Sequence, residues 1–185
     1  MELMEPSRRY LAATNVAGGL IEADAKGVQQ APDMNEVQSP ETYLGFQRAQ
    51  NFVTTGTLGT DTVVNYPAAG TLALNNWTLE GPWNVGGQQA TLDQAGGRVV
   101  YRFHARDLHL VLGPGADGKP VRFKVTIDGQ APGDAHGTDV APDGRGTVTE
   151  QRLYQLVRQP AGVKDRTFSI EFLDPHVSAY AFTFG

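Results

Sequence analysis

The chain has 185 residues, enough for one domain whose core needs neither a metal ion nor a disulfide to hold it together. Its 20 acidic and 15 basic residues leave a net charge of −5, which lacks the basic surface that nucleic-acid binding requires. Cysteine is absent, which excludes thiol chemistry and thiolate metal sites, and no apolar run approaches the roughly 18 residues of a membrane-inserting helix.

The N-terminal part differs in composition from the rest of the chain. Residues 6–13 predict a short helix with Pro6 in its first turn. Arg8-Arg9 also suggests a twin-arginine export signal, but polar residues interrupt the apolar segment that such a signal needs. Residues 18–39 are poor in aromatic side chains and predict a linker, so we expect the folded domain to begin near Ser39.

Short runs of β-forming residues follow, separated by Gly, Pro, Asn and Asp. The first predicted strands are residues 63–66, 71–74, 76–80, 83–85 and 88–92, with a turn at Gly81-Pro82. Residues 98–114 form two runs joined by Ala105-Arg106-Asp107. In each run, side chains suited to the core alternate with side chains that would point the other way. This period of two predicts a hairpin with one face in the core and the other in contact with water.

The last third of the chain continues the pattern. Strands are predicted at residues 121–127, 147–158, 168–173 and 180–184, with a long irregular loop at 129–146. Aromatic residues gather in the final strands, where we expect them to fill the gap between two sheets. The fold class predicted is all-β, a jelly-roll β-sandwich of about nine to eleven mainly antiparallel strands, preceded by a short helix and a linker.

Polar side chains on the predicted strands suggest one candidate binding surface. Glu150, Arg152 and Tyr154 share a face of the strand at 147–158, and Arg102 and His104 share a face of the hairpin. If these faces line one concave surface, they offer donors, acceptors and a flat aromatic ring to a polyhydroxylated ligand. A solvated sheet face explains the same pattern at least as well.

Two further candidates are the loop around His136 and Asp139 and the indole of Trp83. The loop either makes turns, for which Asp and Gly are suited, or contacts a ligand. Calcium at Asp139 and its neighbouring aspartates is disfavoured because their spacing does not match an EF-hand, and no third ligand accompanies His104 and His109 for zinc. We therefore predict no metal site, and Trp83 is either a core side chain or a stacking platform.

Catalytic motifs are missing from the sequence. It contains no G-x-S-x-G, no H-E-x-x-H and no P-loop. Glu150 and Glu171 are the carboxylates on predicted strands that a glycosidase could use, but nothing in their spacing brings them together. We therefore predict that this chain is not an enzyme.

Several segments in order resemble one known family. They are SPETYLG at 39–45, LNNW at 74–77, GGRVVYRFHARDLHLVLGP at 96–114, HGTDV at 136–140, GTVTEQRLYQLVRQ at 146–159, FSIEFLD at 168–174 and the closing AYAFTFG. Together they resemble the C-terminal domain that follows a thioredoxin-like domain in DipZ-type and related bacterial redoxin proteins.

The resemblance implies a jelly-roll module similar to carbohydrate-binding modules, placed behind a thiol–disulfide domain. Residues 1–15 would be the remnant of the last helix of that upstream domain, 16–38 the linker and 39–185 the module. It also implies an extracytoplasmic location. The redox pair of such proteins is Cys-x-x-Cys, which this chain lacks, so it cannot perform the parent's redox chemistry, and no cofactor is expected.

The resemblance supports two hypotheses of function. The first is a non-catalytic accessory module that binds a saccharide such as a cell-envelope glycan, without nucleic acid or membrane insertion. The second is a domain that docks on the upstream thioredoxin-like domain or on a redox partner, which predicts an exposed apolar patch of several hundred Å².

Overall fold

The structure is a computed structural model that describes residues 31–185. The helix predicted at residues 6–13 and most of the predicted linker lie outside the described residues. Within them, the regular elements are β-strands, together with the short 3-10 helix η2 (Gly133–Ala135). No helix in this part of the chain is long and apolar enough to cross a membrane. The all-β prediction is therefore confirmed for residues 31–185.

Eleven strands follow one another within residues 31–185, and they pair with antiparallel neighbours. They are β1 (Thr42–Tyr43), β2 (Val63–Tyr66), β3 (Trp77–Val85), β4 (Ala90–Leu92), β5 (Arg98–Phe103), β6 (Asp107–Gly113), β7 (Val121–Ile127), β8 (Arg145–Val148), β9 (Arg152–Arg158), β10 (Arg166–Phe172) and β11 (Ser178–Phe184). The number and direction of the strands agree with the prediction.

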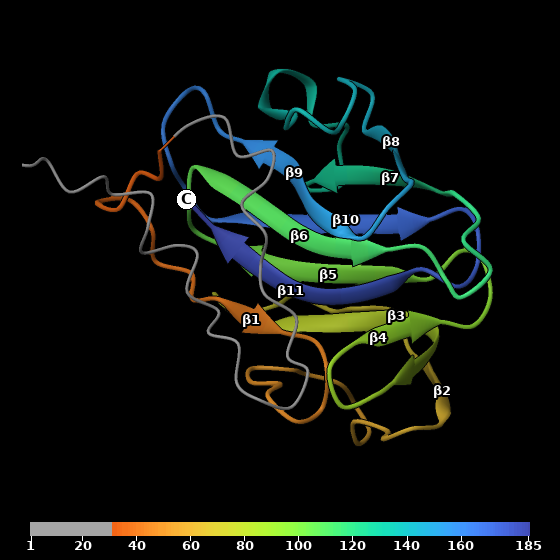
Figure 1. Cartoon of the computed structure of the whole chain (residues 1–185). Helices are drawn as coiled ribbons and strands as arrows, with labels where there is room; N and C mark the ends of the chain where they lie inside the picture. Colours follow the sequence, from red (N-terminus) through yellow and green to blue (C-terminus); the bar gives the residue numbers. More distant parts are fainter. Residues whose placement is uncertain (1–30) are drawn as a thin grey trace, which may run out of the picture.

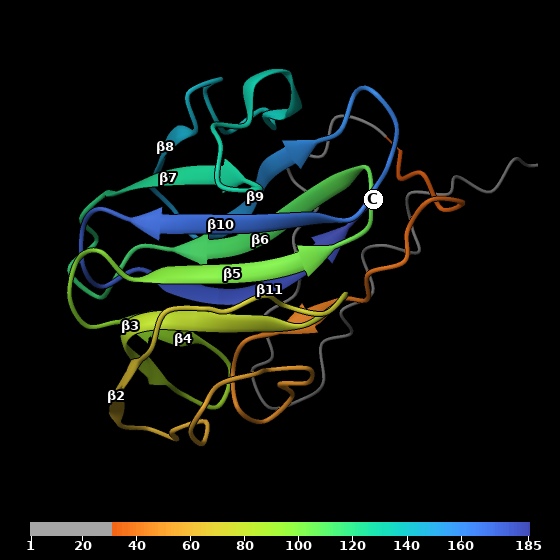
Figure 2. The same ribbon diagram turned by 180° about the vertical axis from the view of Figure 1, so that it is seen from behind.

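The strands form two layers that face each other. Sheet I has the order β8-β7-β10-β5-β3, and sheet II contains β9, β6, β11 and β4, with β1 beside β11 and β2 beside β3. Figure 1 looks onto sheet II with β6 and β11 in front, and Figure 2 looks onto sheet I with β5 and β10 in front. The predicted two-layer arrangement is confirmed, while the jelly-roll pattern of connections stays a prediction.

Aromatic side chains fill the space between the sheets. Phe168 of sheet I meets Phe182 of sheet II edge to face, with ring centroids 5.9 Å apart. Tyr101 lies 4.9 Å from Phe182, and Trp83 lies 5.9 Å from Phe172. All five side chains are fully buried. Aromatic pairs with this geometry contribute about 0.5–1.5 kcal/mol beyond the area that they bury, so they hold the two layers together.

β3 crosses from sheet I to sheet II at Gly81-Pro82. Its residues 77–80 pair with β5, and the rest pairs with β2 and β4. The predicted turn at this dipeptide is therefore wrong, and residues 71–74 form no strand. Gly81 has a φ of 85°, which L-residues rarely adopt, and Pro82 has no N–H to donate to a neighbouring strand. The two residues bend β3 where it changes sheets.

β5 and β6 occupy the stretch predicted as a hairpin, but they do not pair with each other. β5 pairs with β3 and β10 in sheet I, and β6 pairs with β9 and β11 in sheet II. The short connection between them passes from one sheet to the other. All seven residues of β6 are buried, so neither face of this strand meets water. The hairpin prediction is therefore wrong about the pairing of the two runs and about a water-facing side on β6.

The single strand predicted at residues 147–158 is two strands. β8 ends at Val148, the chain bends at residues 149–151, and β9 begins at Arg152. β8 pairs with β7 in sheet I, whereas β9 pairs with β6 in sheet II. Glu150 therefore lies in the bend and not on a strand face with Arg152 and Tyr154.

Candidate functional site

The residues predicted to contact a ligand lie on both sheets and do not line one concave surface. Arg102 lies on the outer face of sheet I, and Arg152 lies at the start of β9 in sheet II. Around Arg102, that outer face carries cross-strand ion pairs: Arg98 is 3.8 Å from Glu80 and 3.3 Å from Glu171. Exposed pairs of this kind are typical of a solvated sheet face and contribute little energy.

Three of the predicted residues meet at the start of β9. Arg152 donates two hydrogen bonds to the carboxylate of Asp139, at 2.8 and 3.1 Å, and its Nε lies 3.6 Å from Glu150. The backbone N–H of Gln155 also donates to Asp139, at 2.7 Å. Hydrogen bonding to Asp139 raises the pKa of the Arg152 guanidinium above its usual value. The cluster ties the loop that carries Asp139 to β9.

Tyr154 belongs to the same cluster but is fully buried. Its hydroxyl donates to the carbonyl of Glu150 at 2.7 Å and accepts from the N–H of Thr149 at 3.1 Å. The guanidinium of Arg152 lies 3.8 Å from the centre of its ring. The ring therefore supports the bend before β9 and is not open to a ligand.

His136 packs its loop against the edge of β9. Its main chain bridges Val157, and its Nδ1 lies 2.9 Å from the carbonyl oxygen of Gly137. At Gly137 a Cβ atom would come within 2.1 Å of the Gln155 carbonyl oxygen, so only glycine allows this close approach. The geometry favours the turn-forming alternative for the loop.

Trp83 is a core side chain. It has no exposed surface, and its Nε1 donates to the carbonyl of Glu80 at 2.8 Å. Nothing of the ring is available for stacking on a sugar. Between the two alternatives that the sequence left open for this residue, the structure supports the core position.

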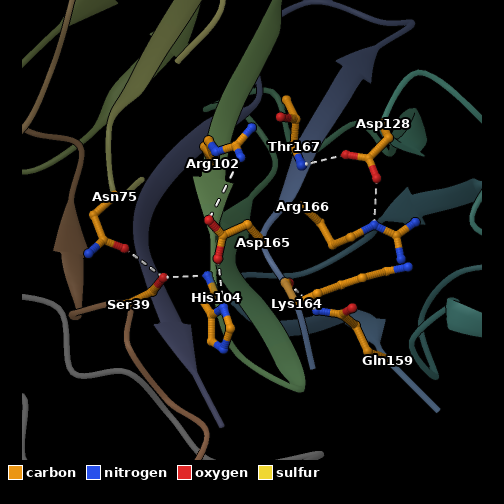
Figure 3. A network of polar contacts seen from close by, with 10 residues as sticks. All are labelled: Ser39, Asn75, Arg102, His104, Asp128, Gln159, Lys164, Asp165, Arg166 and Thr167. Atoms are coloured by element: carbon orange, nitrogen blue, oxygen red, sulfur yellow. Dashed lines mark hydrogen bonds and ion pairs between the residues drawn. The ribbon is translucent and has the colours of Figure 1, made fainter. Parts of the chain in front are cut away.

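His104 and Arg102 share one partner, Asp165, in the polar network shown in Figure 3. His104 Nδ1 lies 2.7 Å from one carboxylate oxygen of Asp165, and Arg102 Nη2 lies 3.7 Å from the other. On its other side, His104 Nε2 is 4.0 Å from Glu36. Both predicted residues therefore hold the segment before β10 against the end of β5.

The same network fastens the start of the domain. The Ser39 hydroxyl accepts from the backbone N–H of His104 at 2.8 Å and donates to the side chain of Asn75 at 2.7 Å (Figure 3). Asn75 in turn donates to the carbonyl of Gln38 at 3.0 Å. Although Ser, His and Asp occur together here, Ser39 contacts the main chain of His104 and not its ring, so the arrangement is not a nucleophile–base pair.

Asp107 is the most buried carboxylate of the ion pairs in the structure. Its side chain is 2% exposed and accepts hydrogen bonds from Arg158 at 2.7 and 3.1 Å and from Arg106 at 2.7 and 3.1 Å. Arg106 also donates to the carbonyl of Ala31 at 2.7 Å. The carboxylate thereby joins the ends of β6 and β9 to the beginning of the described chain.

We expect Asp107→Asn to destabilise the domain by about 2 kcal/mol. Breaking a buried pair costs about 3–5 kcal/mol, but water reaches both arginines and reduces that cost. Asp143→Asn is the matched control, because its pair with Arg145 is largely exposed and is expected to contribute less than about 0.5 kcal/mol. Urea unfolding of the three proteins measures both values, and equal midpoints for the two variants would contradict the account.

The structure places the candidate metal ligands and the two carboxylates considered for glycoside hydrolysis apart from one another within residues 31–185. No group of three or more His, Asp or Glu side chains in this part of the chain could hold a metal ion. Glu150 pairs with Arg152 beside sheet II, whereas Glu171 pairs with Arg98 on the outer face of sheet I. The two carboxylates considered for glycoside hydrolysis are thus in separate ion pairs on different sheets.

One polar hollow lies beside β1, where the sequence predicted no site. It has a volume of about 360 Å³, and its polar side chains include Glu41, Tyr43, Gln47, Arg48, Gln50 and Asn51. We call it the Tyr43 hollow. Its lining comes from β1 and the segments on either side of it. The only signal for this hollow in the sequence was one aromatic residue, Tyr43, among several polar ones.

The Tyr43 hollow contains a half-buried aromatic ring next to charged groups. The Arg48 guanidinium lies 3.6 Å from the centre of the Tyr43 ring, and the Tyr43 hydroxyl donates to Glu41 at 2.8 Å. Burial and this hydrogen bond raise the pKa of Tyr43 to about 12, so the phenol keeps its proton at neutral pH. Trp77 fixes the rim, because its Nε1 donates to the carbonyl of Gln50 at 2.7 Å.

A second hollow of about 340 Å³ lies over β3 and β4. Its lining includes Asp61, Asn84, Gln89, Thr91, Asp93 and His176. We call it the Thr91 hollow. These residues come from distant parts of the chain, and no pattern in the sequence brings them together.

Comparison with known proteins identifies one family and two relatives. A model of the thioredoxin-like C-terminal domain family matches residues 39–185. Protein DipZ of Mycobacterium bovis and Protein DipZ of Mycobacterium tuberculosis are each 30% identical to the chain over 95 residues, which is 48% of this chain and 13% of the relative. The match therefore covers a small part of either relative. Because the family model spans most of the chain, the chain belongs to the thioredoxin-like C-terminal domain family.

Proposed function

We propose that this domain is a non-catalytic accessory module of a thioredoxin-like thiol–disulfide redox protein and that it binds a carbohydrate, such as a cell-envelope glycan. The family and the likeness to part of DipZ support the redox context. The chain has no cysteine, so thiol–disulfide exchange would belong to another domain of the parent protein.

The Tyr43 hollow is the observation that carries the binding proposal. A sugar presents hydroxyl groups around its ring and apolar C–H groups on its faces. Side-chain amides both donate and accept hydrogen bonds, and Gln47, Gln50 and Asn51 supply three of them beside Tyr43 and Arg48. Most small-ligand sites are lined mainly by apolar and aromatic side chains. The Tyr43 hollow is more polar than that, which suits a ligand covered with hydroxyl groups.

The alternative function, docking on a protein, finds less support in the described residues. Large hydrophobic side chains that are exposed there are Met34, Val63 and Leu173. They belong to three separate segments: a turn before β1, the strand β2 and the turn after β10. Scattered exposure of this kind is ordinary for a soluble surface and does not make the continuous apolar patch that docking predicts.

Binding to a glycan array and calorimetry with solubilised peptidoglycan strands test the proposal. We expect dissociation constants between about 1 μM and 1 mM, as for a shallow polar site. Tyr43→Ala and Arg48→Ala should each weaken binding about tenfold or more, as loss of an anchoring aromatic or arginine does. Arg145→Ala removes another exposed arginine, far along the chain on β8, and should change nothing.

Two results would contradict the proposal. One is the absence of binding to every glycan at about 10 mM, a concentration at which even weak sites fill. The other is binding that Tyr43→Ala and Arg48→Ala leave unchanged while both variants keep the unfolding midpoint of the parent domain. The second result would place any glycan outside the Tyr43 hollow.

A further inference from the structure

The two hollows are linked through the turn between β3 and β4. The backbone N–H of Phe46 donates to the carbonyl of Gly86 at 2.9 Å, and that of Gln47 donates to Gly87 at 3.1 Å. The segment that lines the Tyr43 hollow is therefore bonded directly to the turn that lines the Thr91 hollow. Gly86 itself lines the Thr91 hollow.

Gly86 and Gly87 of this turn carry no side chains, and we call this pair the Gly86-Gly87 ridge. A Cβ atom at Gly87 would come within 2.8 Å of Gln47 Nε2, which lines the Tyr43 hollow. A Cβ atom at Gly86 would lie 3.5 Å from the Gln89 carbonyl oxygen and 3.7 Å from Asp61 Oδ1, on the side of the Thr91 hollow. Gly87 thus gives the Gln47 side chain room to lie against the turn, and Gly86 leaves space beside Asp61 on the other side.

The floor of the Thr91 hollow is a row of outward side chains on paired strands. Asn84 of β3 is opposite Thr91 of β4 and opposite Val63 of β2. Thr91 also lies 3.1 Å from the hydroxyl of Ser178 on β11. A rigid sheet with an amide and a hydroxyl on it is suited to the same polyhydroxylated class of ligand as the Tyr43 hollow.

The small volume of each hollow favours one ligand shared between them over two separate ligands. Each hollow is near the lower end of the roughly 300–1,000 Å³ that ligand sites occupy. When one sugar unit of a chain is bound, the next unit is held near the second subsite at a high effective concentration. Two weak neighbouring subsites therefore bind a connected chain more tightly than they bind separate sugars.

We propose that the domain binds an oligosaccharide across the Gly86-Gly87 ridge, with one part in the Tyr43 hollow and the next in the Thr91 hollow. This inference rests on the proposed function and extends it, because it makes the ligand an extended glycan chain and assigns Asn84 and Thr91 to a second subsite.

The test is the dependence of affinity on ligand length. Calorimetry with peptidoglycan oligomers of alternating N-acetylglucosamine and N-acetylmuramic acid, of two, four and six sugars, should show at least tenfold tighter binding for the longer chains than for the disaccharide. Asn84→Ala should remove most of this gain while leaving disaccharide binding unchanged.

Gly86→Leu is the sharper variant, because it places a side chain at the ridge on the side of the Thr91 hollow. The position accepts a Cβ at ordinary contact distance and needs no left-handed backbone. We expect this variant to bind all oligomers as weakly as the disaccharide. Gly56→Leu is the matched control, since a Cβ at Gly56 meets nothing within 4 Å, and it should keep the dependence on length.

The outcomes separate the inference from the proposed function. If no oligomer binds, the proposed function fails. If the disaccharide binds and longer chains bind no more tightly, the function stands and the second subsite is overturned. A Gly86→Leu protein that loses disaccharide binding and length dependence together would also overturn it, because the Thr91 hollow would then not act as a separate subsite.

Discussion

Replacing Trp83 by alanine is expected to destabilise the domain by about 4 kcal/mol. Removal of a fully buried tryptophan loses its transfer energy and leaves a cavity, which together cost about 3–5 kcal/mol. Trp83 packs against Phe172 of the opposite sheet, and its Nε1 bonds to Glu80 within β3. The substitution therefore weakens the contact between the layers and the bend of β3 at the same time.

Denaturant unfolding measures this effect, with two controls. Trp83→Phe keeps a ring against Phe172 and should cost less than Trp83→Ala, and Val63→Ala removes an exposed side chain and should cost under about 0.5 kcal/mol. Complete failure of Trp83→Ala to fold agrees with the account if Trp83→Phe still folds. A Trp83→Ala domain within about 1 kcal/mol of the original would contradict it.

Acidification is expected to remove about 3 kcal/mol of stability through His109. Burial lowers the pKa of His109 to about 4 from its usual 6.5, with Arg158 and Arg106 adding to the effect and Asp107 and Asp139 opposing it. At a pH above 6.5 the imidazole is neutral in both states. As the pH falls from about 6.5 to about 4, the unfolded chain binds a proton that the folded domain does not, so stability is lost across that window.

His109→Gln isolates this contribution. Among residues 31–185, His109 Nε2 has no hydrogen-bond partner and Nδ1 lies 3.4 Å from the Thr183 hydroxyl, so a neutral amide replaces the ring without breaking a strong bond. Carboxylates such as Asp174, whose pKa is lowered to about 2 by hydrogen bonding to Arg122, act equally in both proteins and cancel. The stability difference between the two proteins should change by about 3 kcal/mol from pH 7 to pH 4. Parallel curves would contradict the burial of a neutral histidine.

Strands whose side chains alternate regularly between apolar and polar could be predicted from the sequence. This alternation arises because one face of the strand packs in the core and the other meets water. Residues 121–127 form β7 with alternating buried and largely exposed side chains, as expected for a strand with one wet face. The pairing of β5 and β6 could not be predicted in the same way. A connection of three residues allows either a hairpin or a crossing between sheets, and only the contacts of β6 with β9 and β11 decide between them.

The candidate site could be predicted less well than the fold. Arg152 and Asp139 do meet, but they hold a loop to a strand, because an arginine and a carboxylate in a good geometry satisfy each other. The Tyr43 and Thr91 hollows depend on how the segment after β1 bonds to the turn between β3 and β4. That contact is set by the tertiary fold and leaves no periodic signal in the sequence.

Amide chemical shifts of the isotopically labelled protein, followed during titration with a peptidoglycan hexasaccharide, test the central claim most directly. We expect shifts in residues 41–51 and, across the Gly86-Gly87 ridge, in residues 84–93, with little change near Arg152 or Arg102. Shifts confined to the surroundings of Arg152 and Asp139, or no shifts at about 10 mM sugar, would contradict it.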